Sequence, residues 1–278
     1  MRKIKIVADS SCDIFALKNS HFACAPMKII TDECEFTDNS LLDTDAMVEY
    51  LYQYRGRSQS SCPNTNDWLE AFGNADDIFC VTITSGLSGS YNSACIAKQL
   101  YESEHPGKRV HVFDTLSAGP EITLIIEKID EYIQSGMPYE EICNGVTEYM
   151  KKTGLVFMLK SLKNFANNGR VSPIVAKLVG ITGICIVGKA SDKGTLEPIY
   201  KCRGEKKALE TLVKDLTAEG FRSGKISIGH CQNQSAAESL KELILATYKN
   251  VKVEIHTLKG LCSFYAEKGG VLVGFEKA

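Results

Sequence analysis

The segment 84–91, TSGLSGSY, combines hydroxyl side chains and glycines at a spacing suited to anion binding. It follows an apolar run typical of a buried strand and opens a helical pattern, a junction where backbone N–H groups and hydroxyls converge on an anion. Gly86 and Gly89 allow close approach of the backbone, and Ser85 and Ser88 add short donors. The segment predicts an anion site. The same residues also fit a glycine–serine turn in which a serine caps the helix, and this alternative interpretation remains open at this point.

The same segment also admits a hydrolytic interpretation. Its letters GLSGS differ from the nucleophile elbow G-x-S-x-G only at the last residue. Asp114 follows a predicted strand and His230 ends another, so that Ser88, Asp114 and His230 stand in the chain order of an α/β-hydrolase triad. Serine, aspartate and histidine are common at strand ends, so this order is easily met by chance. The nucleotide-binding fingerprints G-x-G-x-x-G and G-x(4)-G-K-[ST] are absent from the sequence.

Two further polar segments could contribute ligands. The first is 58–64, SQSSCPN, in which Asn64 can cap the helix that follows. The second is 167–173, NNGRVSP, in which Gly169 is expected to end a helix in a left-handed turn and to direct Arg170 outward. Taken alone, each segment also fits an ordinary surface loop, and Arg170 fits a solvated arginine.

The cysteine and histidine spacing argues against a metal site. The sequence holds 11 Cys and 5 His, without a C-x-x-C or an H-x(3–5)-H pair. An odd number of cysteines without a secretory signal predicts reduced thiols. Free cysteines usually pack as small hydrophobic residues, so we expect this role for most of the 11, and we expect no metal.

Composition places the chain among soluble globular proteins. Of its 278 residues 44% are hydrophobic, and 32 Lys+Arg against 34 Asp+Glu give a net charge of −2, which argues against nucleic-acid binding. This length predicts two domains of about 100–170 residues each. The first apolar stretch ends at Asp9, too early for a signal peptide, and no apolar run approaches the roughly 20 residues of a membrane span. We therefore expect a cytoplasmic protein.

The elements that position these residues alternate between strands and helices, which predicts an α/β fold. Apolar runs predict strands at 3–8, 22–30, 78–84, 110–113, 155–159, 184–187, 226–228, 251–255 and 271–275. Helical patterns cover 44–54, 90–102, 120–134, 139–152 and 235–248. A turn signal, DKG at 192–194, adds antiparallel pairing to the second half. We expect an N-terminal domain, 1–152, with a mainly parallel sheet and a C-terminal domain, 153–278, with a mixed sheet.

Five segments in order resemble the bacterial DegV family. The pairs are ADSSCD (8–13) with TDSs-x-D, SSCP (60–63) with TSQP, 84–94 with SSxLSGTYQSA, NGRVS (168–172) with GGRIS, and CRGEKKA (202–208) with xRtxkKA. The resemblance runs from residue 3 to residue 275, and the LSGSY letters are its most specific part.

The resemblance implies a non-catalytic protein without a cofactor that binds a long-chain fatty acid in a cleft between two α/β domains. By position in the family motifs, Ser60 replaces the threonine that holds the carboxylate, Ser61 stands beside it, and Ser85, Ser88 and Gly89 supply the loop donors. The acyl tail would occupy an apolar tunnel. Burying about 14 methylenes at roughly 0.8 kcal/mol each would supply about 11 kcal/mol before ordering costs, so the tail would provide most of the affinity.

Some members of the family present the fatty acid to a separate ATP-dependent kinase subunit, and Arg170 stands where such a partner would dock. Tyr265 replaces the family histidine of H-x-G-x-G, which puts the kinase role in question. Cys62 is the one cysteine expected near the ligand. We expect no nucleic acid partner and at most transient contact with a membrane surface. A regulatory module for another small acid remains a further alternative.

Tunnel-lining residues are not distinguishable from ordinary core by pattern. Phe157, Met158 and Leu159 could line the tunnel, but a buried strand explains the same letters.

Overall fold

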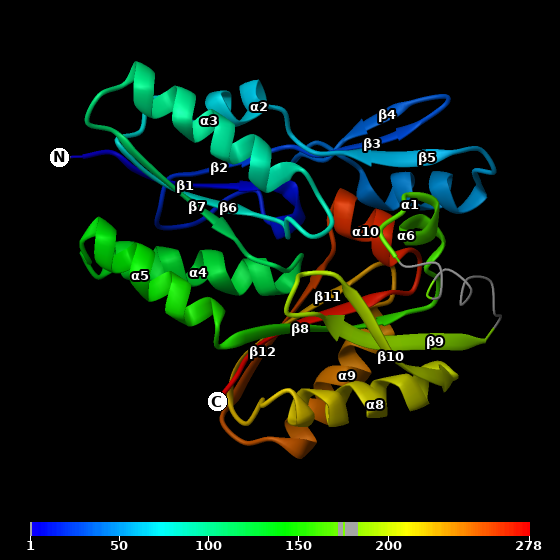
Figure 1. Cartoon of the computed structure of the whole chain (residues 1–278). Coiled ribbons are helices and arrows are strands. Elements are labelled where there is room, and N and C mark those ends of the chain that lie inside the picture. The colour runs from blue at the N-terminus through cyan, green and yellow to red at the C-terminus, as the bar shows by residue number, and fades with distance from the viewer. Residues whose placement is uncertain (1, 172–174, 176–182) are drawn as a thin grey trace.

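The computed structural model describes residues 2–171, 175 and 183–278, and it shows the predicted α/β architecture built on two main sheets (Figure 1). Its strands are β1 (Ile4–Asp9), β2 (Phe22–Ala25), β3 (Lys28–Thr31), β4 (Glu35–Thr37), β5 (Ser58–Ser61), β6 (Asp77–Thr82), β7 (Arg109–Asp114), β8 (Thr153–Leu159), β9 (Ile184–Ala190), β10 (Leu196–Arg203), β11 (Gly224–His230), β12 (Val251–Thr257) and β13 (Val271–Glu276). Its helices are the short η1 (Ser10–Cys12), α1 (Thr44–Gln53), α2 (Thr65–Phe72), α3 (Ser90–Glu104), α4 (Pro120–Gln134), α5 (Tyr139–Met150), α6 (Lys163–Asn167), α8 (Glu205–Ala218), α9 (Gln234–Thr247) and α10 (Gly260–Ala266).

The N-terminal sheet is entirely parallel, in the order β2-β1-β6-β7. All six residues of β6 are buried, as expected for a strand covered on both faces. The helices α2 and α3 cover one face of this sheet (Figure 1). The helix α4 packs on the other face, and its isoleucines form a core there with β1 and β6. The same helix contacts β13 and β11, so it lies between the two main sheets.

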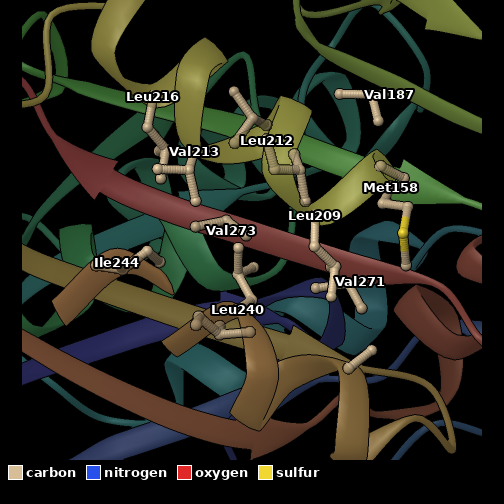
Figure 2. Packing of buried hydrophobic residues seen from close by; sticks show 14 of the residues in the cluster. Met158, Val187, Leu209, Leu212, Val213, Leu216, Leu240, Ile244, Val271 and Val273 are labelled. Atoms are coloured by element: carbon tan, nitrogen blue, oxygen red, sulfur yellow. The ribbon is translucent and has the colours of Figure 1, made fainter. Parts of the chain in front are cut away.

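The C-terminal sheet is mixed, in the order β10-β9-β8-β13-β11-β12, with β11 and β12 parallel and every other pair antiparallel. The predicted turn at 192–194 joins β9 to β10. One face of this sheet packs against α8 and α9 (Figure 2). Side chains alternate along β8, so Val156 and Met158 enter that core while Leu155, Phe157 and Leu159 face the opposite side. Met158, one of the three residues considered for the tunnel wall, therefore does not line the cavity described below.

The expectation of one strand over 22–30 was wrong, because the segment forms two strands in different sheets. Pro26 separates β2, which pairs in parallel with β1, from β3, which lies in a third, antiparallel sheet of order β4-β3-β5. Proline lacks the N–H that a continuous ladder requires. After Pro26 the chain enters the small sheet, in which β3 pairs with β5, the strand that carries Ser60 and Ser61.

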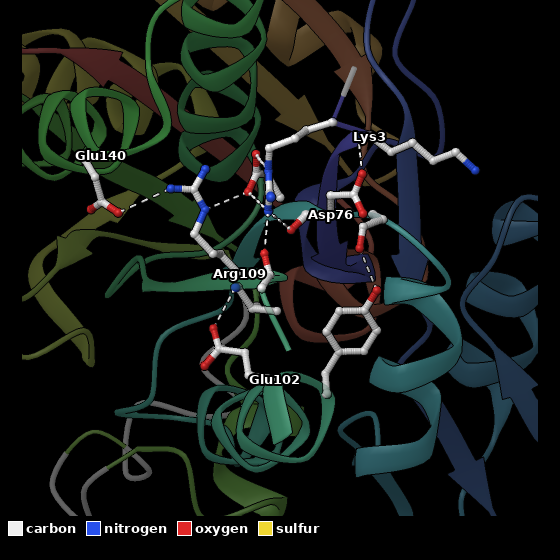
Figure 3. Close-up of polar contacts among 11 residues, drawn as sticks. Lys3, Asp76, Glu102, Arg109 and Glu140 are labelled. Carbon is white, nitrogen blue, oxygen red and sulfur yellow. Dashed lines mark hydrogen bonds and ion pairs between the residues drawn. The ribbon is translucent and has the colours of Figure 1, made fainter. Parts of the chain in front are cut away.

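A charged cluster fixes the edge of the N-terminal sheet where β6 and β7 begin (Figure 3). Asp77 accepts hydrogen bonds from Arg2 and Arg109, and the Arg109 guanidinium lies 4.0 Å from the centre of the Tyr139 ring. Burial opposes ionisation of Asp77, but the two arginine contacts prevail and lower its pKa. None of these residues lines the cavity described below. None of the helices within the described ranges combines the length and apolar content needed to cross a lipid bilayer.

Candidate functional site

A cavity of about 490 Å³ lies between the two halves of the chain, within the size range of small-molecule sites. Most of its wall is apolar. The apolar lining residues are Met27, Ile30, Ile83, Leu87, Leu116, Ala118, Leu155, Phe157, Leu159, Phe165, Ala190, Leu196, Leu261, Ala266 and Leu272. Phe157 and Leu159 thus line the cavity from β8. A long apolar wall of this kind offers its occupant burial rather than polar contacts.

Polar groups gather where β5, α10 and the loop before α3 meet. Ser60, Ser61, Ser88 and Gly89 line the cavity there, so the structure brings together four of the five predicted ligand residues. Ser61 is exposed, and its hydroxyl donates to the carbonyl of Cys62.

Ser85, the fifth, is exposed and does not line the cavity. Its backbone N–H donates to Asp114 Oδ1 at 3.0 Å, which holds it at the outer side of the loop. The neighbouring Thr84 lines the cavity instead, and its hydroxyl donates to the Gly194 carbonyl at 2.9 Å.

Asp9 holds the loop 83–90 at both ends. Its Oδ2 accepts from Ile83 N at 2.9 Å and from the Ser90 hydroxyl at 2.6 Å, while Oδ1 accepts from the Ser11 hydroxyl. The side chain is fully buried, and burial raises its pKa despite these hydrogen bonds. Asp9 thereby fixes the turn that presents Ser88. Its position at the end of β1 was visible in the sequence, but nothing there paired it with residue 90.

Tyr265, on α10, lines the cavity next to Ser60. Its Oη lies 2.7 Å from Ser60 Oγ, and its ring packs against Phe165 and Phe264 at centroid distances of 4.7 and 4.9 Å. Burial raises the pKa of Tyr265, so the phenol stays neutral and can donate a hydrogen bond at physiological pH.

Arg170 points into the site, so the expectation that it is directed outward was wrong. Its Nε donates to the Leu87 carbonyl at 3.1 Å, a further bond reaches the Asn168 carbonyl, and the side chain lines the cavity. The carbonyls of Leu87, in the loop before α3, and of Asn168, directly after α6, accept from the guanidinium and hold it inward. Among the cavity-lining residues in the described part of the chain, Arg170 is the one that carries a charge. Ser172, from the same motif, lies outside the described residues.

The hydrolase alternative fails on geometry. Ser88 Oγ accepts from the backbone N–H of Ser90 at 3.2 Å. Asp114 accepts from backbone N–H groups, and His230 Nε2 lies 2.6 Å from Gln234 Oε1 on the six-stranded sheet. No contact joins Ser88, Asp114 and His230 in these fully described segments, so no base is available to the serine.

Two cysteines, Cys62 and Cys262, line the cavity, so the expectation that Cys62 alone lies near the ligand missed Cys262. All 11 cysteines are free thiols. Cys262 is fully buried, and burial raises its pKa well above the usual value, as expected for a packing residue. Within the described ranges, no three His, Cys, Asp or Glu side chains gather in a group able to hold a metal ion.

Comparison with known proteins gives matches over almost the whole chain. The model of the DegV family matches residues 3–278. A DegV domain-containing protein of Streptococcus pneumoniae is 41% identical over 276 residues, covering 98% of this chain and 98% of that protein.

Solved structures agree with the fold. A DegV family protein from Eubacterium eligens loaded with heptadecanoic acid superimposes with a TM-score of 0.96 at 44% identity, covering 99% of this chain and 100% of the other. The fatty acid kinase (Fak) B3 protein of Streptococcus pneumoniae loaded with linoleic acid gives 0.96 at 41% identity, covering 99% of both chains.

Proposed function

Because the chain belongs to the DegV family, we propose that it binds one long-chain fatty acid, with the acyl tail in the apolar cavity and the carboxylate at its polar end. The observation that carries the proposal is the cavity itself: about 490 Å³, walled mainly by apolar side chains, with the hydroxyls of Ser60 and Tyr265 in contact in its lining. Relatives at 41–44% identity hold heptadecanoic and linoleic acid. The chain acts without catalysis of its own.

We propose that hydroxyl and backbone donors, with one positive charge beside them, hold the head group. The hydroxyls of Ser60, Ser88 and Tyr265 and the backbone of Gly89 meet at this end, and Arg170 supplies positive charge nearby. A carboxylate accepts from several short donors without needing a full ion pair. The tail supplies most of the affinity, and the donors fix its direction.

A titration of delipidated protein tests this proposal. We expect a saturated acid of about 16 carbons to bind one per chain, and its methyl ester to bind more weakly, by about tenfold. Ser88→Ala should weaken binding of the acid. Ser85→Ala is the matched control, since Ser85 lies outside the cavity wall, and it should bind as the unaltered protein does. A folded protein that binds neither acid nor ester would contradict the proposal.

We further propose that the bound acid is presented to a separate ATP-dependent kinase subunit, in the cytoplasm. The Fak B3 relative supports this partner class, as does the placement of Ser61 and Gly89, which are exposed at the polar end of the cavity. Trapping acyl phosphate with hydroxylamine tests it. Hydroxamate should form only when this chain, a fatty acid kinase's ATP-binding subunit, fatty acid and ATP are all present. No hydroxamate with a kinase subunit that serves the Fak B3 protein would contradict it, and Tyr265 would then be the first residue to exchange for histidine.

A further inference from the structure

The first turn of α10 is held by carboxylates from the opposite half of the molecule. The helix has no side-chain cap of its own at Lys259. Instead Asp38 Oδ1 accepts from Gly260 N and Asp38 Oδ2 accepts from Leu261 N, each at 2.8 Å. Asp13 Oδ1 accepts from Lys259 N at 2.7 Å. Three consecutive backbone donors are thus satisfied by residues more than 220 positions earlier in the chain.

The contact between Asp38 and α10 is buried, and it leaves no room for a side chain at residue 260. Asp38 is 0% exposed and Asp13 3%. A Cβ on residue 260 would lie 2.6 Å from Asp38 Oδ1, so only glycine lets the carboxylate approach the helix. Asp38 itself is fixed directly after β4, where its backbone N–H donates to the Met27 carbonyl at 2.8 Å.

The held helix carries much of the cavity wall. Leu261 and Cys262 lie in its first turn, and Tyr265 and Ala266 lie one turn further on. Because α10 has seven residues, a displacement of its first turn moves Tyr265 relative to Ser60. Glu267, which follows the helix, is fastened separately to Ser161 and Asn164, so the two ends of the helix are fixed by different contacts.

We propose that Asp38 is a positioning residue for ligand binding: its buried carboxylate, supplied by the N-terminal half, holds α10 in the place where Tyr265 reaches Ser60 at the head-group end of the cavity. The inference rests on the proposed function, because its effect is read from a bound fatty acid. It concerns the residue that shapes the site rather than one that touches the ligand.

The surroundings make this contact sensitive to acid. Asp38 faces the carboxyls of Asp9 and Asp13 at the end of β1, the thiol of Cys24 on β2 and the thiol of Cys262 on α10. Lys259 contributes positive charge toward Asp13. Burial, together with the charge of Asp9, raises the pKa of Asp38 to about 6, despite the bonds from the helix. Protonation turns one acceptor oxygen into a hydroxyl, so one of the two bonds to α10 is lost.

The test is the rate at which bound fatty acid is released between about pH 8 and about pH 5. We expect release from the unaltered protein to accelerate about tenfold as the pH falls through the pKa of Asp38. Asp38→Asn should release fast at every pH and lose the step near pH 6, so that only the titration of the ligand's own carboxyl and of Asp13, whose pKa is about 8, remains. Asp67→Asn, which removes a carboxylate cap from the distant helix α2, is the matched control and should leave release unchanged.

A second variant keeps the test informative if Asp38→Asn fails to fold. Gly260→Ala keeps the carboxylate of Asp38 but separates it from the helix, so it should release fatty acid faster and lose the step near pH 6, because the bond that protonation would break is already absent. Circular dichroism shows whether each variant is folded. If the unaltered protein binds fatty acid and folded Asp38→Asn shows the same rates and pH profile, the positioning role is overturned while the proposed function stands. If the unaltered protein binds no fatty acid, the proposed function itself fails.

Discussion

Tyr265 Oη and Ser60 Oγ lie 2.7 Å apart although 205 residues separate them in the chain. The contact joins α10, near the C-terminus, to β5 of the small antiparallel sheet, and it crosses the polar end of the cavity. A carboxylate bound here would meet two hydroxyls that are already oriented toward each other. The two halves of the chain therefore build the proposed head-group site jointly, and neither half contains it alone.

Tyr265→Phe tests this contact. The ring keeps its packing against Phe165 and Phe264, but the hydroxyl is lost and Ser60 loses its partner. A hydrogen bond of this kind contributes about 1 kcal/mol, so fatty acid affinity should fall roughly fivefold. Tyr52→Phe, on an exposed tyrosine outside the cavity, is the control. Equal affinities for Tyr265→Phe and the unaltered protein, measured by calorimetry, would refute the role of the hydroxyl.

Arg170→Ala tests the one cavity-lining charge in the described part of the chain. Removing it should weaken binding of a fatty acid anion about tenfold and leave the affinity for the alcohol of equal chain length unchanged, since charged partners strengthen a hydrogen bond. Competition between the two ligands on one protein sample measures this directly. If acid and alcohol lose affinity to the same extent, Arg170 acts only by supporting the Leu87 carbonyl.

Gly86→Ala tests the contact between the loop 83–90 and the β9–β10 turn, both of which contribute residues to the cavity wall. A Cβ on residue 86 would lie 2.5 Å from the Lys193 carbonyl oxygen, at the tip of the β9–β10 turn. Neither backbone can yield without separating the loop of Thr84 from Gly194. We expect faster exchange of bound fatty acid and a loss of stability of about 1–3 kcal/mol. Gly107→Ala, where a Cβ would meet open space although the backbone φ is +88°, controls for backbone strain alone. Equal exchange rates in the two variants would contradict a role for this contact in the exchange of bound fatty acid.

Asp13→Asn tests how the buried acids affect stability. Burial raises the pKa of Asp13 from 3.8 to about 8. The folded state therefore keeps a proton that the unfolded state releases above about pH 4, and this group lowers the free energy of unfolding as the pH rises through that window. Asparagine keeps the acceptor for Lys259 N and tolerates the left-handed φ of 60°.

At about pH 8 the asparagine variant should therefore be more stable than the unaltered protein, by about 2 kcal/mol, and the gain should vanish toward pH 4. Urea unfolding at several pH values measures it. Asp77→Asn should act oppositely, because the arginine contacts lower that pKa against burial, so its stabilising effect is present above about pH 4. A destabilised Asp13→Asn at pH 8 would show that the charge is better compensated than its surroundings indicate.

Much of the fold follows from local pattern. The helices α3, α4, α5 and α9 lie within two residues of their predicted bounds at every end, since each carries an apolar stripe or a terminal signal. The antiparallel sheet β4-β3-β5 was not predicted, because SQSS at 58–61 has no apolar alternation and is a strand only through pairing with β3. Strand pairing of this kind depends on residues distant in sequence.

Some residues of the candidate site were likewise visible in local sequence motifs, and others became visible only in the folded structure. Ser60, Thr84, Ser88 and Gly89 stand in short motifs of the sequence, whereas Cys262 looks like an ordinary packing residue there. Asp38 offers no signal at all, since its partners at 260 and 261 appear only when α10 is placed beside β3 and the residue that follows β4. The direction of Arg170 likewise depends on the Leu87 carbonyl, which no local pattern reveals.

The most direct test of lipid binding is to extract the purified, folded protein with organic solvent and to identify the extract by mass spectrometry. The cavity, its hydroxyl-lined end and the family membership predict a long-chain fatty acid, recovered from the unaltered protein at close to one per chain and in smaller amount from Ser88→Ala. A folded protein that yields no fatty acid, and that takes up none when long-chain acids are added after purification, would contradict the account.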